Sequence, residues 1–323
     1  MARVQFRKGE TQVFCPMNAE SEKPSKGRWE KEQRDKMTTA GTAVVVASAL
    51  AVTKLAVGLL TASMSVLASF LDSLLDALIS TLNLFSIRFA GMPADVDHGF
   101  GHEKAESLAA LFQFVIVAGS ALALAAVAVV RGLQGAVVHN PKEGMWVMLA
   151  TTVVSLLLSV RMRVVAARTG SPALSADSMH YATDVWTNLG VVCALATVRW
   201  TGMQWVDPAV SVALAGYILY AVVAPLRDAI DVLMDRELPE EERYRIGLLI
   251  ERHDPHVVGH HKLRTRRSGN RRFVEFHVLI QHHVTFQEAH DITESLMDSI
   301  RCEFPGASVI AHTDPDTAPL EDD

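Results

Sequence analysis

Hydrophobic residues are concentrated in the middle of the chain, in six segments separated by short polar links. The segments span residues 38–60, 63–90, 105–131, 144–167, 173–199 and 206–226. Each is close to the roughly 20 residues that a helix needs to cross a bilayer. The pattern therefore predicts six transmembrane helices.

After the sixth segment the pattern changes to that of a small α+β domain, in which short apolar runs alternate with charged residues. Val274, Phe276 and Val278 alternate with Glu275 and His277, as in a strand with one face buried. The predicted order is αββαβ. Its elements are a helix that opens at residue 239, strands at 259–266 and 272–280, a helix at 286–304 and a strand at 309–310.

Composition supports this division into parts. Half of the 323 residues are hydrophobic and 20% are charged, which is less charge than the about 25% typical of soluble domains. The net charge of −6 gives no electrostatic basis for binding nucleic acid. We predict a flexible cytosolic extension (1–36), a transmembrane domain (37–230), a cytoplasmic domain (231–315) and a tail (316–323).

Lysine and arginine mark one face of the predicted bundle as cytoplasmic. Basic residues occur in the N-terminal extension, in the link after the fourth segment and at the ends of other segments on the same side, whereas the opposite side has few. Both termini are therefore expected in the cytoplasm.

The second and fifth membrane segments contain carboxylates and a histidine away from their ends, and a charged residue costs about 2.5–3.5 kcal/mol at the centre of a membrane helix. Asp72 and Asp76 lie in the second segment, and Asp177, His180 and Asp184 lie in the fifth. Residues four apart share a helix face, so Asp72 pairs with Asp76 and His180 with Asp184. Carboxylates and imidazole are ligands for a divalent cation such as zinc, and both can also take up protons.

Other interpretations of these polar residues remain open. They could form a structural network between helices, or a carboxylate could pair with Lys54 in the first segment. An enzyme is not indicated, because the chain has no HExxH, GxSxG or phosphate-binding loop sequence.

Three stretches resemble the cation diffusion facilitator family, and among its members the bacterial ferrous-iron/zinc efflux (YiiP-like) type. They are the stretch from Ser65 to Asp76, the link that starts at Pro93 and contains DVDHGFGHEKAESLA, and the stretch ADSMHYATD from Ala176 to Asp184. The resemblance covers about residues 40–315. It implies a homodimeric antiporter in the bacterial inner (cytoplasmic) membrane, with divalent metal ions and protons as its substrates and a metallochaperone-like cytoplasmic domain.

The resemblance also implies the site residues. The transport site is expected at Asp72, Asp76, His180 and Asp184, and a loop site at Asp95, His98 and His102, although a solvated polar loop is the simpler interpretation of the loop alone. A binuclear site at the dimer contact is expected at His261, His277, His290, His312 and Asp314. Lys104 and Asp235 match a charge pair where the two domains meet.

The chain departs from the family pattern at His260, at Lys262 and at the His282-His283 pair. Those histidines, together with His253 and His256, are expected to be surface residues. The transport quartet implies export of zinc, cadmium or iron(II) from the cytoplasm. The alternatives are a manganese- or iron-selective exporter of the same family, or a metal sensor or heterodimer partner that does not transport.

Overall fold

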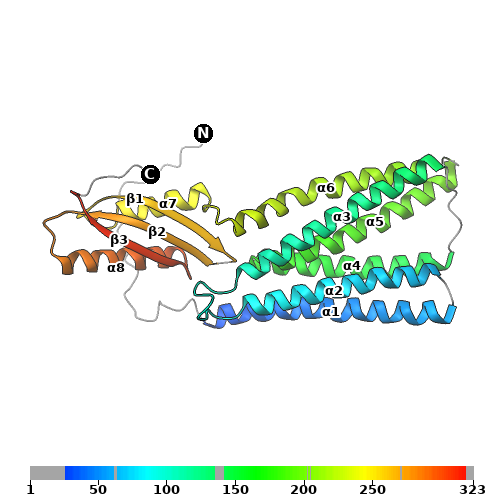
Figure 1. Cartoon of the computed structure of the whole chain (residues 1–323), viewed down its shortest axis with the longest axis horizontal. Coiled ribbons are helices and arrows are strands. Elements are labelled where there is room, and N and C mark those ends of the chain that lie inside the picture. The colour runs from blue at the N-terminus through cyan, green and yellow to red at the C-terminus, as the bar shows by residue number, and fades with distance from the viewer. Residues whose placement is uncertain are drawn as a thin grey trace. The chain divides into compact units, whose positions relative to one another are not determined.

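The computed structural model describes residues 26–61, 64–134, 142–201, 203, 205–269 and 271–317. The side chains of some residues within the helices, Asp72 among them, lie outside this description. The chain divides into two units at Met234 and Asp235. Figure 1 shows long helices in the first unit and an α+β arrangement in the second.

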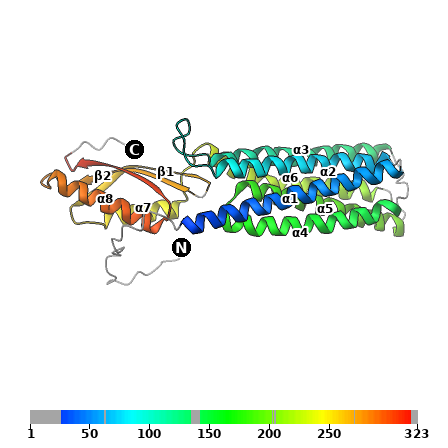
Figure 2. The same ribbon diagram turned by 90° about the horizontal axis from the view of Figure 1, so that it is seen from below.

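The first unit consists of helices that follow the six apolar segments. They are α1 (Lys26–Thr61), α2 (Met64–Ala90), α3 (Lys104–Gln134), α4 (Lys142–Thr169), α5 (Pro172–Thr201) and α6 (Val206–Leu233). Helix α3 packs along α6, α4 packs along α5, and α5 also contacts α2, α3 and α6. Figure 2 shows the six helices running lengthwise beside one another.

Small and β-branched side chains line the contact among α3, α5 and α6. Small residues allow helix backbones to approach closely, which is how membrane helices pack without a hydrophobic driving force between them. The buried cluster consists of Ala110, Phe114, Val117, Ala121, Ala176, Ile218, Val222 and Ala229. This packing places α5 in contact with several helices and fixes the position of its polar residues.

Within the described residues, five helical stretches are long and apolar enough to cross a membrane. They lie at residues 30–56, 73–90, 104–134, 149–169 and 208–233. Helix α5 is not among them, and several of its side chains lie outside the description. It nevertheless runs for 30 residues and packs beside α4.

Helix α1 begins at Lys26, well before the apolar segment at residue 38, so the last part of the predicted flexible extension is helical. The polar stretch is rich in Lys, Glu, Arg and Gln, which are good helix formers. It also has partners in the bundle. Gln33 Nε2 donates to the Ile87 carbonyl at 2.9 Å, and Lys36 Nζ lies 2.9 Å from Glu106 Oε1. Residues 1–25 and 318–323 lie outside the described residues.

The second unit has the predicted αββαβ order. Its elements are α7 (Glu240–Glu251), β1 (Val257–Ser268), β2 (Arg271–Ile280), α8 (Phe286–Glu303) and β3 (Ser308–Pro315). The sheet order is β1-β2-β3, with β1 antiparallel and β3 parallel to β2. The parallel pairing needs a crossover, and α8 provides it.

One face of the sheet forms the hydrophobic core of this unit. Val274, Phe276, Val278 and Ile280, the alternating residues of β2, are buried against α7 and α8. Helix α8 starts with a capping box, in which the Thr285 side chain accepts from the Glu288 N–H and the Glu288 side chain accepts from the Thr285 N–H. With this face closed, residues of the opposite face such as His277 remain available for polar contacts.

A buried ion pair ties α1 to α3, and its loss should destabilise the bundle. Glu106 is 3% exposed; it contacts Lys36 and also accepts a hydrogen bond from Ser171. Changing Glu106→Gln leaves the Lys36 ammonium without its carboxylate, which typically costs about 3–5 kcal/mol for a buried pair. We expect a clearly lower thermal unfolding midpoint of the purified protein in detergent.

The double variant Glu106→Gln/Lys36→Met removes both charges and should recover part of that loss. A Glu106→Gln variant that unfolds at the wild-type temperature contradicts this account.

Candidate metal sites

The first cluster joins α2 and α5 in the middle of the bundle. His180 Nε2 lies 2.9 Å from Asp76 Oδ1. Asp184 follows His180 by about one turn, and ligand atoms of all three residues lie within 4.8 Å of one another. The expected partner Asp72 lies one turn before Asp76 on α2, but its side chain is outside the described residues. The structure thus brings together three of the four predicted transport residues.

Water has only limited access to this cluster. The side chains of Asp76 and His180 are 26% and 13% exposed. A carboxylate in such a place needs a cation or a proton. Lys54 of α1 donates a 2.7 Å hydrogen bond to Ser73 Oγ, so it reaches α2 next to Asp72.

A buried hydrogen-bond chain lies behind the cluster. Gln113 Nε2 donates to Asp177 Oδ1 at 2.9 Å, and Asn83 Nδ2 donates to Gln113 Oε1 at 2.6 Å. Asp177 is fully buried, and its Oδ2 has no hydrogen-bond partner among the described residues. The chain links α2, α3 and α5, so a structural polar network exists beside the ligand cluster. Asp177 belongs to that network.

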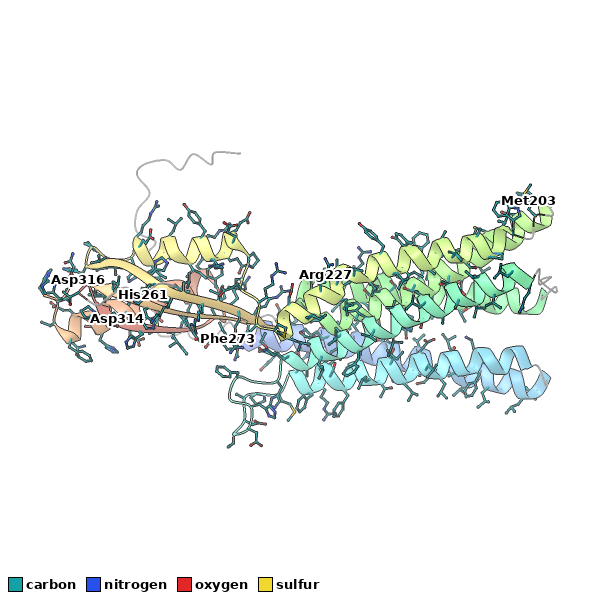
Figure 3. All side chains as sticks on the ribbon, turned by 45° about the horizontal axis from the view of Figure 1, so that its top comes forward. Met203, Arg227, His261, Phe273, Asp314 and Asp316 are labelled. Carbon is teal, nitrogen blue, oxygen red and sulfur yellow. The ribbon has the colours of Figure 1, made fainter. Side chains whose placement is uncertain are left out.

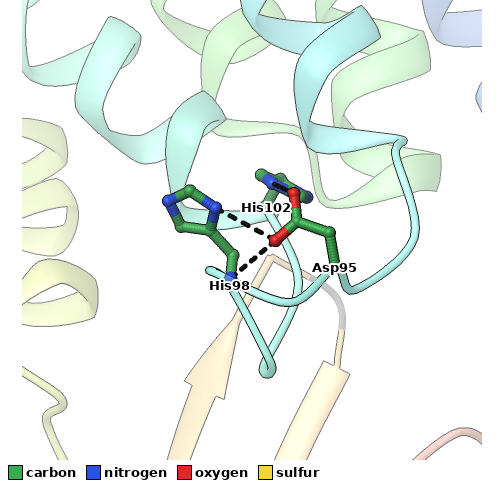
Figure 4. A group of neighbouring side chains, drawn as sticks. All are labelled: Asp95, His98 and His102. Carbon is green, nitrogen blue, oxygen red and sulfur yellow. Dashed lines mark hydrogen bonds and ion pairs between the residues drawn. The ribbon is translucent and has the colours of Figure 1, made fainter.

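The second cluster lies in the link between α2 and α3 (Figure 4). Asp95 Oδ1 is 3.3 Å from His98 Nδ1, and its Oδ2 is 3.2 Å from His102 Nε2. The backbone N–H of His98 also donates to Asp95. This N–H, with the nearby imidazoles of His102 and His98, holds the pKa of Asp95 below its ordinary value despite some desolvation. The carboxylate is therefore ionised and available to a cation.

Burial differs sharply between the two histidines of this link. His102 is 5% exposed and packs edge-on against Phe89 at 4.6 Å between ring centroids, whereas His98 is exposed. Gly101 has φ of 91°, and this left-handed conformation lets the link turn back so that His98 and His102 face the same carboxylate. The link is thus an ordered turn.

The third cluster lies on the second unit's sheet, on the face opposite the hydrophobic core. His261 of β1 pairs with His277 of β2, which pairs with His312 of β3. Asp314, two residues further, lies on the same face as His312. Its Oδ2 is 3.1 Å from His261 Nε2 and 2.8 Å from His277 Nδ1, and its Oδ1 is 3.3 Å from His312 Nε2.

The Asp314 carboxylate is thus shared by three imidazoles. Partial burial favours its neutral form, but the hydrogen bonds from His277 and His261 outweigh it and lower its pKa. The Nδ1 atom of His261 is buried and has no hydrogen-bond partner among the described residues. An ionised bridging carboxylate with a buried, unused imidazole nitrogen fits a metal ligand set.

His290 and Lys262 lie outside the ligand group that the described residues form. His290 lies on α8 with an exposed side chain and is not part of the cluster formed by the described residues of one chain. Lys262 sits in a bulge of β1 with φ of 53°, and it lines a groove with His277 and His312. Lys262 therefore lies beside the cluster, and its positive charge disfavours a bound cation there.

The predicted Lys104–Asp235 pair spans the two units. Within the first unit, Lys104 Nζ contacts the Leu233 carbonyl at 3.5 Å. Within the second, Asp235 accepts from Arg266 Nη1 at 3.2 Å. The pair stays a prediction.

Comparison with known proteins identifies the family of the chain. The cation efflux transmembrane domain matches residues 42–234, and the cytoplasmic domain of cation efflux proteins matches residues 238–316. The chain belongs to the cation efflux family. The family's division into a helical membrane domain and a cytoplasmic domain confirms the fold class and the family predicted from the sequence.

Several relatives of this cation efflux protein are similar over most of its length. The cation-efflux pump FieF of Pectobacterium atrosepticum is 41% identical over 277 residues, which covers 86% of this chain and 92% of that protein. FieF of Yersinia enterocolitica is 38% identical over 274 residues, covering 85% and 91%. The solved zinc form of CzrB is 35% identical and covers 27% of this chain and all of its own, with a TM-score of 0.25.

These matches confirm that this multi-pass membrane protein is a transporter of the cation efflux family and not an enzyme. A structural polar network was one of the interpretations left open by the sequence, but its members Asn83 and Gln113 were not identified there. Asn83 and Gln113 are polar residues within apolar segments, and this position could have indicated a hydrogen bond between helices. The predicted transport site did not include Asp177, and the sequence alone did not show that its partner is Gln113.

The network around Gln113 gives a prediction about stability. Changing Gln113→Leu removes the hydrogen bonds that Gln113 makes with the buried Asn83 amide and Asp177 carboxyl, and a buried polar group that loses its hydrogen bond costs about 1–3 kcal/mol. We expect a lower thermal unfolding midpoint in detergent. Asp177→Asn keeps an acceptor oxygen for Gln113 and should cost much less. Equal midpoints for Gln113→Leu and the wild type would show that the network does not stabilise the bundle.

Proposed function

We propose that this protein exports divalent transition-metal ions from the cytoplasm in exchange for protons. The observation that carries the proposal is the cluster of Asp76, His180 and Asp184, held between two helices of the membrane unit. Asp72, one turn from Asp76 on the same helix face, is the proposed fourth ligand.

The donor set limits the ions that suit this site. Three carboxylates and one imidazole offer four ligands of the kind that zinc accepts in a tetrahedron. Cadmium and iron(II) accept the same ligand types, and selection among such ions in cells depends largely on metal supply. Zinc, iron(II) and cadmium are therefore the proposed cargo.

Proton exchange follows from the same residues. Ionised carboxylates cannot remain together in a low-dielectric site without compensating charge. Either a divalent ion or protons on His180 and the aspartates satisfy this requirement. The site can therefore alternate between metal-bound and protonated forms, and a proton gradient would drive metal out of the cell.

The two outer clusters have proposed roles in supplying and sensing the ion. The link cluster at Asp95 combines an exposed and a buried histidine, which suits an exchangeable site. The sheet cluster at Asp314 is proposed to bind regulatory metal in a homodimer, with the exposed His290 contributing at the contact between copies. We further propose a bacterial inner-membrane location with both termini cytoplasmic, and Lys104 and Asp235 as a pair between the units.

Transport in proteoliposomes tests the proposal. Vesicles that hold purified protein and an interior pH dye receive external zinc, cadmium, iron(II) or manganese. We expect zinc entry to raise the interior pH and to be faster when the interior starts acidic. His180→Ala should reduce both signals about tenfold or more, since a lost ligand costs at least about 1.4 kcal/mol of binding.

Thr187→Ala is a matched control, because Thr187 lies on the same helix and its hydroxyl bonds only the Thr183 carbonyl among the contacts of the described residues. It should transport like the wild type. Zinc entry without a pH change would overturn the antiport mechanism. No flux of any ion, with metal still bound to the second unit, would favour a sensor that does not transport.

A further inference from the structure

A second group of histidines lies at one end of the second unit's sheet, beyond the Asp314 cluster. Val257 at the start of β1 pairs with Ile280 at the end of β2, and Ile280 also pairs with Pro315 at the end of β3. The residues that flank these strand ends therefore meet. Gln281 N–H donates to the His256 carbonyl at 3.1 Å, and Asp316 N–H donates to the Ile280 carbonyl at 2.9 Å.

These flanking segments carry three exposed histidines, His256, His282 and His283. Figure 3 shows Asp316 at this end of the sheet, with Phe273 toward the other end and His261 and Asp314 between them. None of the three histidines contributes to the His261, His277 and Asp314 group.

Two of the three histidines are oriented by carboxylates. His256 Nδ1 lies 2.8 Å from Asp254 Oδ1, and the His256 backbone N–H donates to the same oxygen at 2.8 Å. His282 has the same arrangement with Asp316 Oδ1, at 2.8 Å and 3.0 Å. The side chain and the backbone of each histidine are thus fixed by one oxygen.

This arrangement determines which imidazole nitrogen is available. An ionised carboxylate only accepts hydrogen bonds, so Nδ1 must carry the proton and Nε2 of the neutral ring keeps its lone pair. A carboxylate that holds the second nitrogen of an imidazole is the usual support of a metal-binding histidine. His256 and His282 therefore each present a prearranged ligand atom.

The His283 ring lies near both other rings, somewhat further from each than binding one ion requires. The His283 ring centroid lies 6.2 Å from that of His256 and 6.0 Å from that of His282. Two imidazoles on one tetrahedral zinc ion have centroids about 5 Å apart, from metal–nitrogen distances of about 2.0–2.1 Å. Rotation of the exposed His283 side chain would bring its ring closer to both. Glu288, which interacts electrostatically with His256 and His283, adds negative charge nearby.

We propose that His256, His282 and His283 form an additional, exchangeable binding site for a divalent transition-metal ion. Nε2 of His256 and of His282 and one nitrogen of His283 are the protein ligands, and water completes the coordination. Asp254 and Asp316 act as positioning residues. Three of the five histidines expected at the surface thus gain a shared role, whereas His253 and His260 are half-buried in the structure. The proposal does not depend on transport.

The test measures metal binding by the full chain in detergent, after removal of metal with a chelator. Equilibrium dialysis against zinc, followed by elemental analysis, gives ions bound per chain. We expect the His282→Gln/His283→Gln variant to bind one ion fewer than the wild type. When cobalt(II) replaces zinc, the visible absorption of the variant should be lower than that of the wild type, because one cobalt ion fewer is bound.

His253→Gln is the matched control. His253 belongs to the same unit, but its Nδ1 lies 3.5 Å from Ser299 Oγ and it takes no part in the cluster. It should bind as many ions as the wild type. Asp254→Asn keeps an acceptor oxygen for the backbone but loses the carboxylate, and should weaken the site about 10–100-fold.

Unfolding temperatures without metal show whether the double variant folds as the wild type does. If the double variant is less stable than the wild type, metal binding is measured on the single variant His283→Gln. This variant should fold normally, since no hydrogen bond of the described structure involves the His283 ring. The proposal is overturned if the stable variant binds as many ions per chain as the wild type and has the same cobalt spectrum.

Discussion

The contact between Asp76 of α2 and His180 of α5 is the constraint on which the rest of the membrane unit depends. Each isolated charge at the centre of a membrane helix costs about 2.5–3.5 kcal/mol, so carboxylates persist there only beside partners. The 2.9 Å contact supplies one partner. The buried chain through Gln113 holds α2, α3 and α5 at a fixed spacing, and the small residues of α3 and α6 allow the close packing that this spacing needs.

The three ligand clusters share residue types but differ in what holds them. In the membrane unit, two continuous helices present ligands at one-turn spacing. Between α2 and α3, a turn wraps its ligands around Asp95. On the sheet, register places His261, His277 and His312 side by side over Asp314. The carboxylate of the link cluster is more exposed than that of the membrane cluster, at 50% for Asp95 against 26% for Asp76.

Much of this arrangement was predictable from sequence, because it depends on short-range periodicity. The six apolar segments, the αββαβ order and the one-turn spacing of His180 and Asp184 all follow from residue patterns. Asp177 shows what local periodicity cannot predict. Its position on the helix was clear from the sequence, but the other members of its hydrogen-bond chain, Asn83 and Gln113, lie on other helices. Similarly, the gathering of His256 and His282 depends on strand register, which no local pattern of either segment contains. The helical start of α1 at Lys26 depends on contacts with α2 and α3.

The central claim is that the membrane cluster exchanges protons for a divalent metal. The most direct measurement is the number of protons released per zinc ion bound by the purified protein in weakly buffered detergent solution. The wild type is compared with Asp76→Ala, so that release from the link and sheet clusters cancels. The account predicts that the variant loses one bound ion together with the protons which that ion displaces. Equal zinc binding and equal proton release in the two proteins would contradict it.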